Sequence, residues 1–459
     1  MPPARLLVTM WITTALASGA QALDLTEAWR AAALHDPEFA AARAAHEAGL
    51  ARRTQAGALW RPNIQLESGV GRASIENATR GAAFSAPGLG ASGGVAFDTS
   101  VTSGTSTRVA LAVRQPLVDR EREAQSRQLE IAADVAELEW LDAQQALKLR
   151  SSERYFDAAL AAEQLRLLTR QTAAVDQALL EAQDRFRIGD RPVTDTHEAA
   201  ARAASLASRR LAAETELELK RVALADLVGP QPVGVPLPLP TAPVRVDDVG
   251  VLADWLAQAR QRNPALGVAE ARLRAARQEQ NKTSTALSPS LDLVAHIGRE
   301  RLSGTGDFGG ASNTSNNRAV GVQLAVPLYT GGWRSARQIE ARALVDKAHA
   351  DVERARQQVA LQTRSAWLEL AVGSGRQAAL SSAALASQAR LDATRVGLRA
   401  GDRTTQELLD AENDAAAADL ALMQARVQLL TNRLRLSALA GQLDETHLSQ
   451  IDAALRARR

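Results

Sequence analysis

The sequence predicts a mainly α-helical chain that carries four β-strands and is built from two internal repeats. Three observations indicate this fold class. Two long segments contain no proline and can therefore form long helices. Short motifs of the first half recur in the second half. Four segments alternate apolar and polar residues with the period of a strand. Each half is expected to contain, in order, a helix, a strand, a loop, a strand, a very long helix, a tight turn and a helix.

The first 22 residues have the composition of a secretory signal peptide. Arg5 precedes an apolar run over 6–16, and Ala20-Gln21-Ala22 forms an A-x-A cleavage site. We therefore expect the mature chain to begin at Leu23, outside the cytoplasm. No later stretch reaches the ~20 apolar residues of a transmembrane helix, so a chain that spans a membrane would have to use strands.

The composition excludes several classes of function. The 459 residues include no cysteine, which excludes disulfides, thiolate metal sites and a lipidated N-terminal cysteine. The 54 Lys and Arg residues nearly balance the 52 Asp and Glu residues, so no basic stripe for nucleic acid is expected. The six histidines lack metal-binding spacing, and no catalytic constellation is visible. We expect neither an enzyme nor a protein that holds a cofactor or a metal.

Two proline-free segments, 117–191 and 328–459, are open to long helices. A helix of roughly 70 residues is about 100 Å long. The last segment also has an apolar heptad with small residues three positions further on, which predicts a coiled-coil seam with closely spaced helices. The heptad positions are Leu408, Ala415, Leu422, Leu429 and Leu436.

Matching motifs define the two repeats. Asp36-Pro37 recurs as Asn263-Pro264, and Arg187-Ile-Gly-Asp-Arg191 recurs as Arg399-Ala-Gly-Asp-Arg403. We expect the repeats to span 23–228 and 251–442, each with a helical hairpin tip, near 189 and near 401. The Pro-rich segment 229–250 is expected to be an extended linker, and 443–459 a C-terminal tail.

Four strands are expected, at about 63–71, 107–118, 290–298 and 318–329. One face of each is apolar, which fits either a lipid-facing barrel or a soluble sheet packed on a helix. The Gly-, Ser-, Thr- and Asn-rich segments 72–107 and 299–317 are expected to be long loops, and such loops favour the barrel. Because closed barrels need about eight strands, a membrane barrel would have to be shared between protomers.

Acidic residues follow both tips. Asp195 comes six residues after Gly189, and Glu407 comes six residues after Gly401; Asp410 lies three residues beyond Glu407, on the same helix face. Acidic residues in the first turn of a helix interact favourably with the positive end of the helix dipole. Repeated around a closed ring, they could instead select cations.

The duplicated motifs, their order and their spacing resemble the TolC family of outer-membrane channels over residues 23–442. The most specific pieces are Arg187-Ile-Gly-Asp-Arg-Pro-Val-Thr-Asp195 and Gly397-Leu-Arg-Ala-Gly-Asp-Arg-Thr-Thr-Gln-Glu-Leu-Leu-Asp410, with Arg114-Gln-Pro-Leu117 beside them. The resemblance implies a homotrimer with a transmembrane β-barrel of 12 strands, four per protomer, above an α-helical coiled-coil tunnel. It places the protein in the lipid of the cell outer membrane, extending into the periplasm.

The resemblance also implies partners: a periplasmic membrane-fusion adaptor protein and, through it, an inner-membrane ABC transporter or proton-driven pump. The leading functional hypothesis is a passive conduit for type I protein secretion. The missing lipobox cysteine favours this hypothesis, because it indicates the branch of the family without a lipid anchor. The same conduit in multidrug efflux is the alternative, and a periplasmic coiled-coil scaffold or adaptor is the alternative from a different class.

The resemblance assigns roles to nine residues. Asp195, Arg403 and Leu398 fall on the constriction of the periplasmic entrance, and Glu407 and Asp410 fall on two acidic selectivity rings. The adaptor-contacting tips are Gly189, Asp190, Gly401 and Asp402. Leu398 stands where the family has a tyrosine, which removes a hydrogen-bond donor and predicts a looser or differently built gate.

Overall fold

The computed structural model describes residues 23–88, 90–190, 192–230, 236–244, 249–285, 288–307, 309–329 and 331–456. The expected signal peptide, 1–22, lies outside these residues, as do Arg191 and parts of the linker. Contacts divide the chain into two compact units: the first contains the residues up to 46, 138–268 and those from 353 on, and the second contains 47–137 and 269–352.

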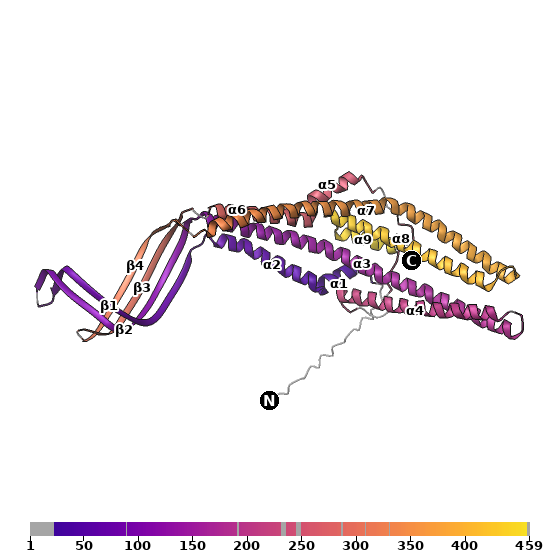
Figure 1. The fold of residues 1–459 in the computed structure, drawn as a ribbon, viewed down its shortest axis with the longest axis horizontal. Helices are drawn as coiled ribbons and strands as arrows, with labels where there is room; N and C mark the ends of the chain where they lie inside the picture. Colours follow the sequence, from indigo (N-terminus) through magenta and orange to yellow (C-terminus); the bar gives the residue numbers. More distant parts are fainter. Residues whose placement is uncertain are drawn as a thin grey trace, which may run out of the picture. The chain divides into compact units, whose positions relative to one another are not determined.

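The described helices of the two halves match in order and in length. In the first half they are α1 (Leu25–His35), α2 (Pro37–Ala58), α3 (Arg120–Arg187) and α4 (Val193–Val228), with 11, 22, 68 and 36 residues. In the second half they are α5 (Leu252–Arg262), α6 (Pro264–Thr285), α7 (Trp333–Ala400) and α8 (Thr405–Leu439), with 11, 22, 68 and 35 residues. Both long proline-free segments therefore form the long helices that the sequence predicts (Figure 1).

The predicted heptad seam of α8 lies in the interior of the first unit. Ala415, Leu422, Leu429 and Leu436 are all buried. On α7, a Cβ added to Gly373 would lie 2.5 Å from the Leu429 side chain, so the glycine allows a close approach of the two helices. The small residues of the seam thus permit the tight packing that the sequence predicts.

The C-terminal segment, expected to be a tail, is helix α9 (Glu445–Arg456). Its buried residues Leu448, Ile451 and Leu455 share one hydrophobic core with Leu25 of α1 and Tyr155 of α3. The spacing of the three α9 residues is that of an amphipathic helix, so the signal was present in the sequence.

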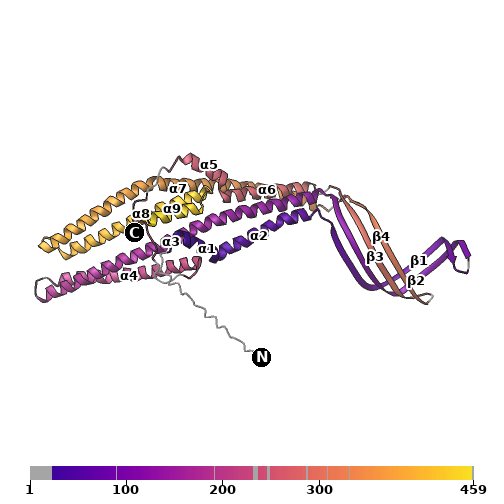
Figure 2. The same ribbon diagram turned by 180° about the vertical axis from the view of Figure 1, so that it is seen from behind.

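The second unit contains one antiparallel sheet whose strands follow the chain order: β1 (Asn63–Ala86), β2 (Gly90–Val118), β3 (Ser290–Gly306) and β4 (Gly309–Ala325). Figures 1 and 2 show the four strands side by side. Neighbouring strands keep their apolar residues in register, for example Leu66 with Leu111 and Leu293 with Val322. β1 and β4 each have one neighbour among the described strands.

The prediction of long loops at 72–107 and 299–317 is wrong. β1 and β2 stay paired as far as Ala86 and Gly90, and β3 and β4 as far as Gly306 and Gly309. Backbone groups make the ladder, so a Gly- and Ser-rich segment can extend a strand that its partner already holds in register. At the other end, β4 stops at Ala325 rather than 329, because Pro327 has no N–H to donate.

The two faces of the sheet differ in chemistry. Leu66, Val70 and Val320 are 72%, 74% and 78% exposed, so the described chain leaves one apolar face uncovered. On the other face Arg114 donates to Asp292, whose side chain is buried. None of the described helices is both long and apolar enough to cross a membrane.

Candidate functional site

At the tips of the two helical hairpins, α3–α4 and α7–α8, the turns that end α3 and α7 have the same backbone structure. Gly189 and Gly401 have φ of 79° and 85°, a conformation that side chains disfavour. The next residues, Asp190 and Asp402, donate their N–H groups back to Arg185 and Gly397 over 2.9 Å each. This is the Schellman motif, which satisfies the last carbonyls of a helix and reverses the chain.

Behind the second tip, Glu407 closes a capping box. Its backbone N–H donates to Thr404 Oγ1 over 3.2 Å, and its carboxylate accepts from the Thr404 N–H over 2.7 Å. Arg403 Nη1 also donates to Glu407 Oε1, over 2.7 Å. These contacts from the Thr404 N–H, then Arg403, lower the pKa of Glu407 below its ordinary value. The carboxylate is therefore ionised at neutral pH and fixes the start of α8.

Leu398 and Arg403 lie on either side of the same turn. The half-buried Leu398 accepts the N–H of Gly401 through its carbonyl over 3.2 Å. A Cβ added to Gly397 would lie 2.6 Å from the Cγ of Arg403, so this glycine leaves room for the arginine stem. The absence of a side chain at 397 thus helps to place the arginine near Glu407.

Asp195 belongs to the first turn of α4 and lines a small hollow between the two tips. The hollow has a volume of about 180 Å³ and is also lined by Arg185 of α3 and by Thr404 and Gln406 of the other hairpin. The structure therefore places Asp195 at the junction of the two hairpins, while Arg403 bonds to Glu407 in its own hairpin.

Asp410 contacts the other hairpin. Arg202 of α4 donates to the Asp410 carboxylate, and its second terminal nitrogen donates to the Leu409 carbonyl over 3.3 Å. Sequence reasoning missed Arg202. A signal was available for the arginine, because Arg202 directly precedes Ala203, the first residue of an apolar heptad on α4, and coiled coils carry their pairing charges at this position.

Every acid between 407 and 414 of α8 accepts from an arginine. Three of these arginines belong to the α7–α8 hairpin itself, and Arg202 belongs to α4. The pairs are Glu407 with Arg403, Asp410 with Arg202, Glu412 with Arg395, and Asp414 with Arg390. The negative charge at this end of α8 is therefore balanced residue by residue.

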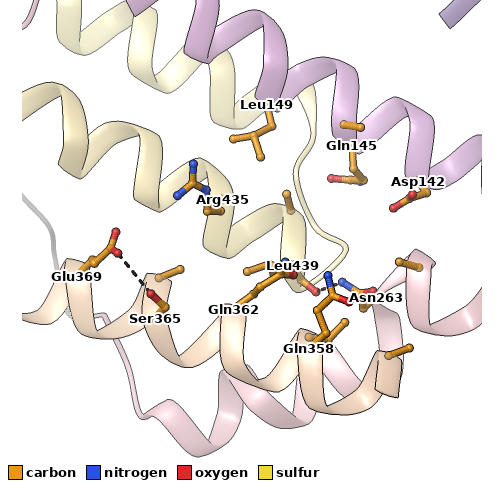
Figure 3. Close-up of a pocket in the computed structure, with 16 residues that line it drawn as sticks. Asp142, Gln145, Leu149, Asn263, Gln358, Gln362, Ser365, Glu369, Arg435 and Leu439 are labelled. Atoms are coloured by element: carbon orange, nitrogen blue, oxygen red, sulfur yellow. Dashed lines mark hydrogen bonds between the residues drawn. The ribbon is translucent and has the colours of Figure 1, made fainter. Parts of the chain in front are cut away.

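Further from the tips, a hollow of about 470 Å³ opens between α3, α7 and α8 (Figure 3). Gln358 and Gln362 of α7 line it with Arg435 of α8, which pairs with Glu153 of α3 over 2.7 Å. Ser365 and Glu369 bond to each other at 3.3 Å along its wall. In the part of the chain that the structure describes, no group of three His, Cys, Asp or Glu side chains could hold a metal ion.

Comparison with known families identifies the chain. The profile described as "Outer membrane efflux protein" matches residues 29–230 and 255–442, which is most of the sequence. The chain belongs to the outer membrane efflux protein family. The resemblance stated from the sequence motifs is thereby confirmed. As a member of this family, the protein lies in the cell outer membrane and extends into the periplasm.

Individual relatives in the family match over nearly the full length. The "Proteases secretion protein PrtF" of Dickeya chrysanthemi is 26% identical over 97% of this chain and 94% of its own. The "Alkaline protease secretion protein AprF" of Pseudomonas aeruginosa is 28% identical over 95% and 88%, and the "Outer membrane protein TolC" of Vibrio cholerae is 26% identical over 96% of both chains.

A solved structure shows the same fold. The outer membrane protein VceC of Vibrio cholerae superposes with a TM-score of 0.72 over 92% of this chain and 97% of its own, at 18% identity. The helical hairpins and the four-stranded sheet thus have the fold of this outer membrane protein.

Proposed function

We propose that three copies of the chain form an outer-membrane channel-tunnel, which passively conducts protein substrates as the outer part of a type I secretion system. Two relatives that match more than nine-tenths of the chain are named as protease secretion proteins. This observation is the main support for proteins as the substrate class. The given sequence contains no cysteine that could carry a lipid, which supports the same choice.

The sheet supports the trimer. The described residues leave its apolar face uncovered, and β1 and β4 each leave an edge without a described neighbour. Unpaired backbone groups are too costly in lipid, so the edges must meet other strands. Three four-stranded sheets joined edge to edge give the 12-strand barrel. The matched helix lengths of the two halves support an internal duplication that gives each protomer two helical hairpins for the tunnel.

The hairpin tips supply the periplasmic entrance. We propose that Gly189-Asp190 and Gly401-Asp402 meet the adaptor protein, through which an inner-membrane ABC transporter is engaged. Asp195, Leu398 and Arg403 would form the constriction, and Glu407 and Asp410 the acidic rings. The matching Schellman turns support this assignment, because α3 and α7 end in the same backbone turn at the two tips.

Multidrug efflux is the second candidate, because the family as a whole is described as an efflux family. Deleting the gene in the source organism separates the two. Type I secretion predicts that one or a few proteins disappear from the culture supernatant while antibiotic sensitivity stays unchanged. Efflux predicts increased sensitivity with an unchanged supernatant. Complementation with the full chain should restore the phenotype, and complementation with residues 23–459, which lack the signal peptide, should not.

A further inference from the structure

Arg202 of α4 is a charged residue that joins the two hairpins near their tips. Its side chain is 24% exposed, against 46% for the Asp410 side chain that it contacts. Because it donates to both the carboxylate of Asp410 and the carbonyl of Leu409, it holds the backbone and a side chain of α8 together. Two bonds from one planar guanidinium fix orientation as well as distance.

The local sequence offers Arg202 an easier partner. Glu198 lies one helical turn earlier on α4, in the i, i+4 arrangement that forms ion pairs within a helix. The guanidinium nevertheless reaches across to α8. Packing explains this choice, because Leu206 of α4 and Leu409 of α8 belong to one buried cluster with Val175 of α3. That cluster sets the spacing of the helices, and Arg202 lies within reach of α8 as a result.

This contact differs from the other ion pairs of the same acidic segment. Arg403, Arg395 and Arg390 pair with acids inside their own hairpin, so movement of that hairpin as a body leaves these pairs intact. Separation of α4 from α8 breaks the Arg202–Asp410 pair. The same movement would leave Asp410 with an unopposed negative charge.

We propose that Arg202 is a positioning and selectivity-determining residue of the entrance: it holds the α3–α4 hairpin against the α7–α8 hairpin, and it cancels the charge of Asp410 until the hairpins separate. The inference rests on the proposed channel function. In the trimer, three copies of the pair surround one entrance. The closed entrance is then nearly neutral at this depth, and the open entrance carries a ring of three carboxylates.

Two single variants test the two parts of this role in planar lipid bilayers. Arg202→Gln and Asp410→Asn both remove the ion pair between the hairpins, so both should raise the single-channel conductance severalfold over the wild type. Their effects on ion selectivity should be opposite. In a KCl gradient the reversal potential of Arg202→Gln should move towards that of K⁺, because the negative charge of Asp410 is left unopposed. The reversal potential of Asp410→Asn should move towards that of Cl⁻, because the positive charge of Arg202 is left unopposed. The double variant should keep the raised conductance with the selectivity of the wild type.

Arg390→Gln is the matched control, because it breaks an ion pair inside one hairpin; its conductance should equal that of the wild type. Heat-sensitive trimer bands on gels verify assembly of each variant. Wild-type conductance in Arg202→Gln, or shifts of the reversal potential in the same direction in both single variants, would overturn the inference alone. A wild-type protein that assembles and forms no pore would overturn the proposed function, and the inference with it.

Discussion

The residues that matter most at the tips are two glycines and one capping box. Gly189 and Gly401 are needed for their backbone conformation rather than for space, since a Cβ added to either would have no atom within 4 Å. The sequence was sufficient to predict both turns, because Gly-Asp recurs at matching places. It was not sufficient to choose between capping and pore roles for Glu407, which depend on the partner that each oxygen finds.

Replacing Gly401 by alanine should destabilise the tip by roughly 1–2 kcal/mol, the cost of a left-handed conformation for a residue with a Cβ. Amide hydrogen exchange over residues 395–410 should become about 5–30-fold faster. Gly375→Ala is the matched control, because Gly375 lies at an exposed position in the middle of α7 and no atom lies near the added Cβ. Alanine favours the helix more than glycine does, so amide exchange around residue 375 should become slower. Equal effects of the two changes would show that the turn does not require a glycine.

The capping box should make the second tip sensitive to acid. The pKa of Glu407 is lowered in the folded chain, so its ionised form favours the folded tip. Its contribution is present at neutral pH and is lost as the pH falls through that lowered pKa. Protection of the tip amides, corrected for intrinsic exchange, should fall over this acid range in the wild type. In Glu407→Gln the protection should already be lower at neutral pH and should vary less; an unchanged profile would contradict the role of the cap.

At the scale of elements, hydrophobic periodicity predicted the long helices and the α8 seam, because one face of each repeats over many turns. It failed where neighbours decide the outcome. The Gly- and Ser-rich extensions of β1 to β4 carry little strand propensity of their own and are held by pairing alone. Helix α9 does have helical periodicity in the sequence, but its packing partner α1 lies more than 400 residues away in sequence, so its place in the core could not be predicted.

Asp452 of α9 is expected to stabilise the first unit by capping α1. Its carboxylate is buried and accepts the N–H groups of Leu25 and Thr26 over 2.9 Å each, two donors that the start of a helix leaves without partners. Asp452→Ala should cost roughly 2–3 kcal/mol. The apparent melting temperature of the protein in detergent should drop by several degrees, and Gln450→Ala on the exposed face of α9 should leave it unchanged. A small drop for Asp452→Ala, equal to that of Gln450→Ala, would contradict the cap.

At the scale of the whole molecule, the central claim is that one chain is a third of a channel. The sequence indicated this because its four strands are too few to close a barrel. The sheet supports it, because among the described residues its two edge strands each lack one neighbour and its apolar face is uncovered. What no single chain contains is the contact between protomers.

Native mass spectrometry of the purified full-length protein in detergent tests this claim most directly. The account predicts a complex of three mature chains, each beginning at Leu23, that resists dissociation until the detergent is replaced by a denaturant. A stably folded monomer under the same conditions, with the helical circular dichroism of the intact chain, would contradict the shared barrel and the channel built on it.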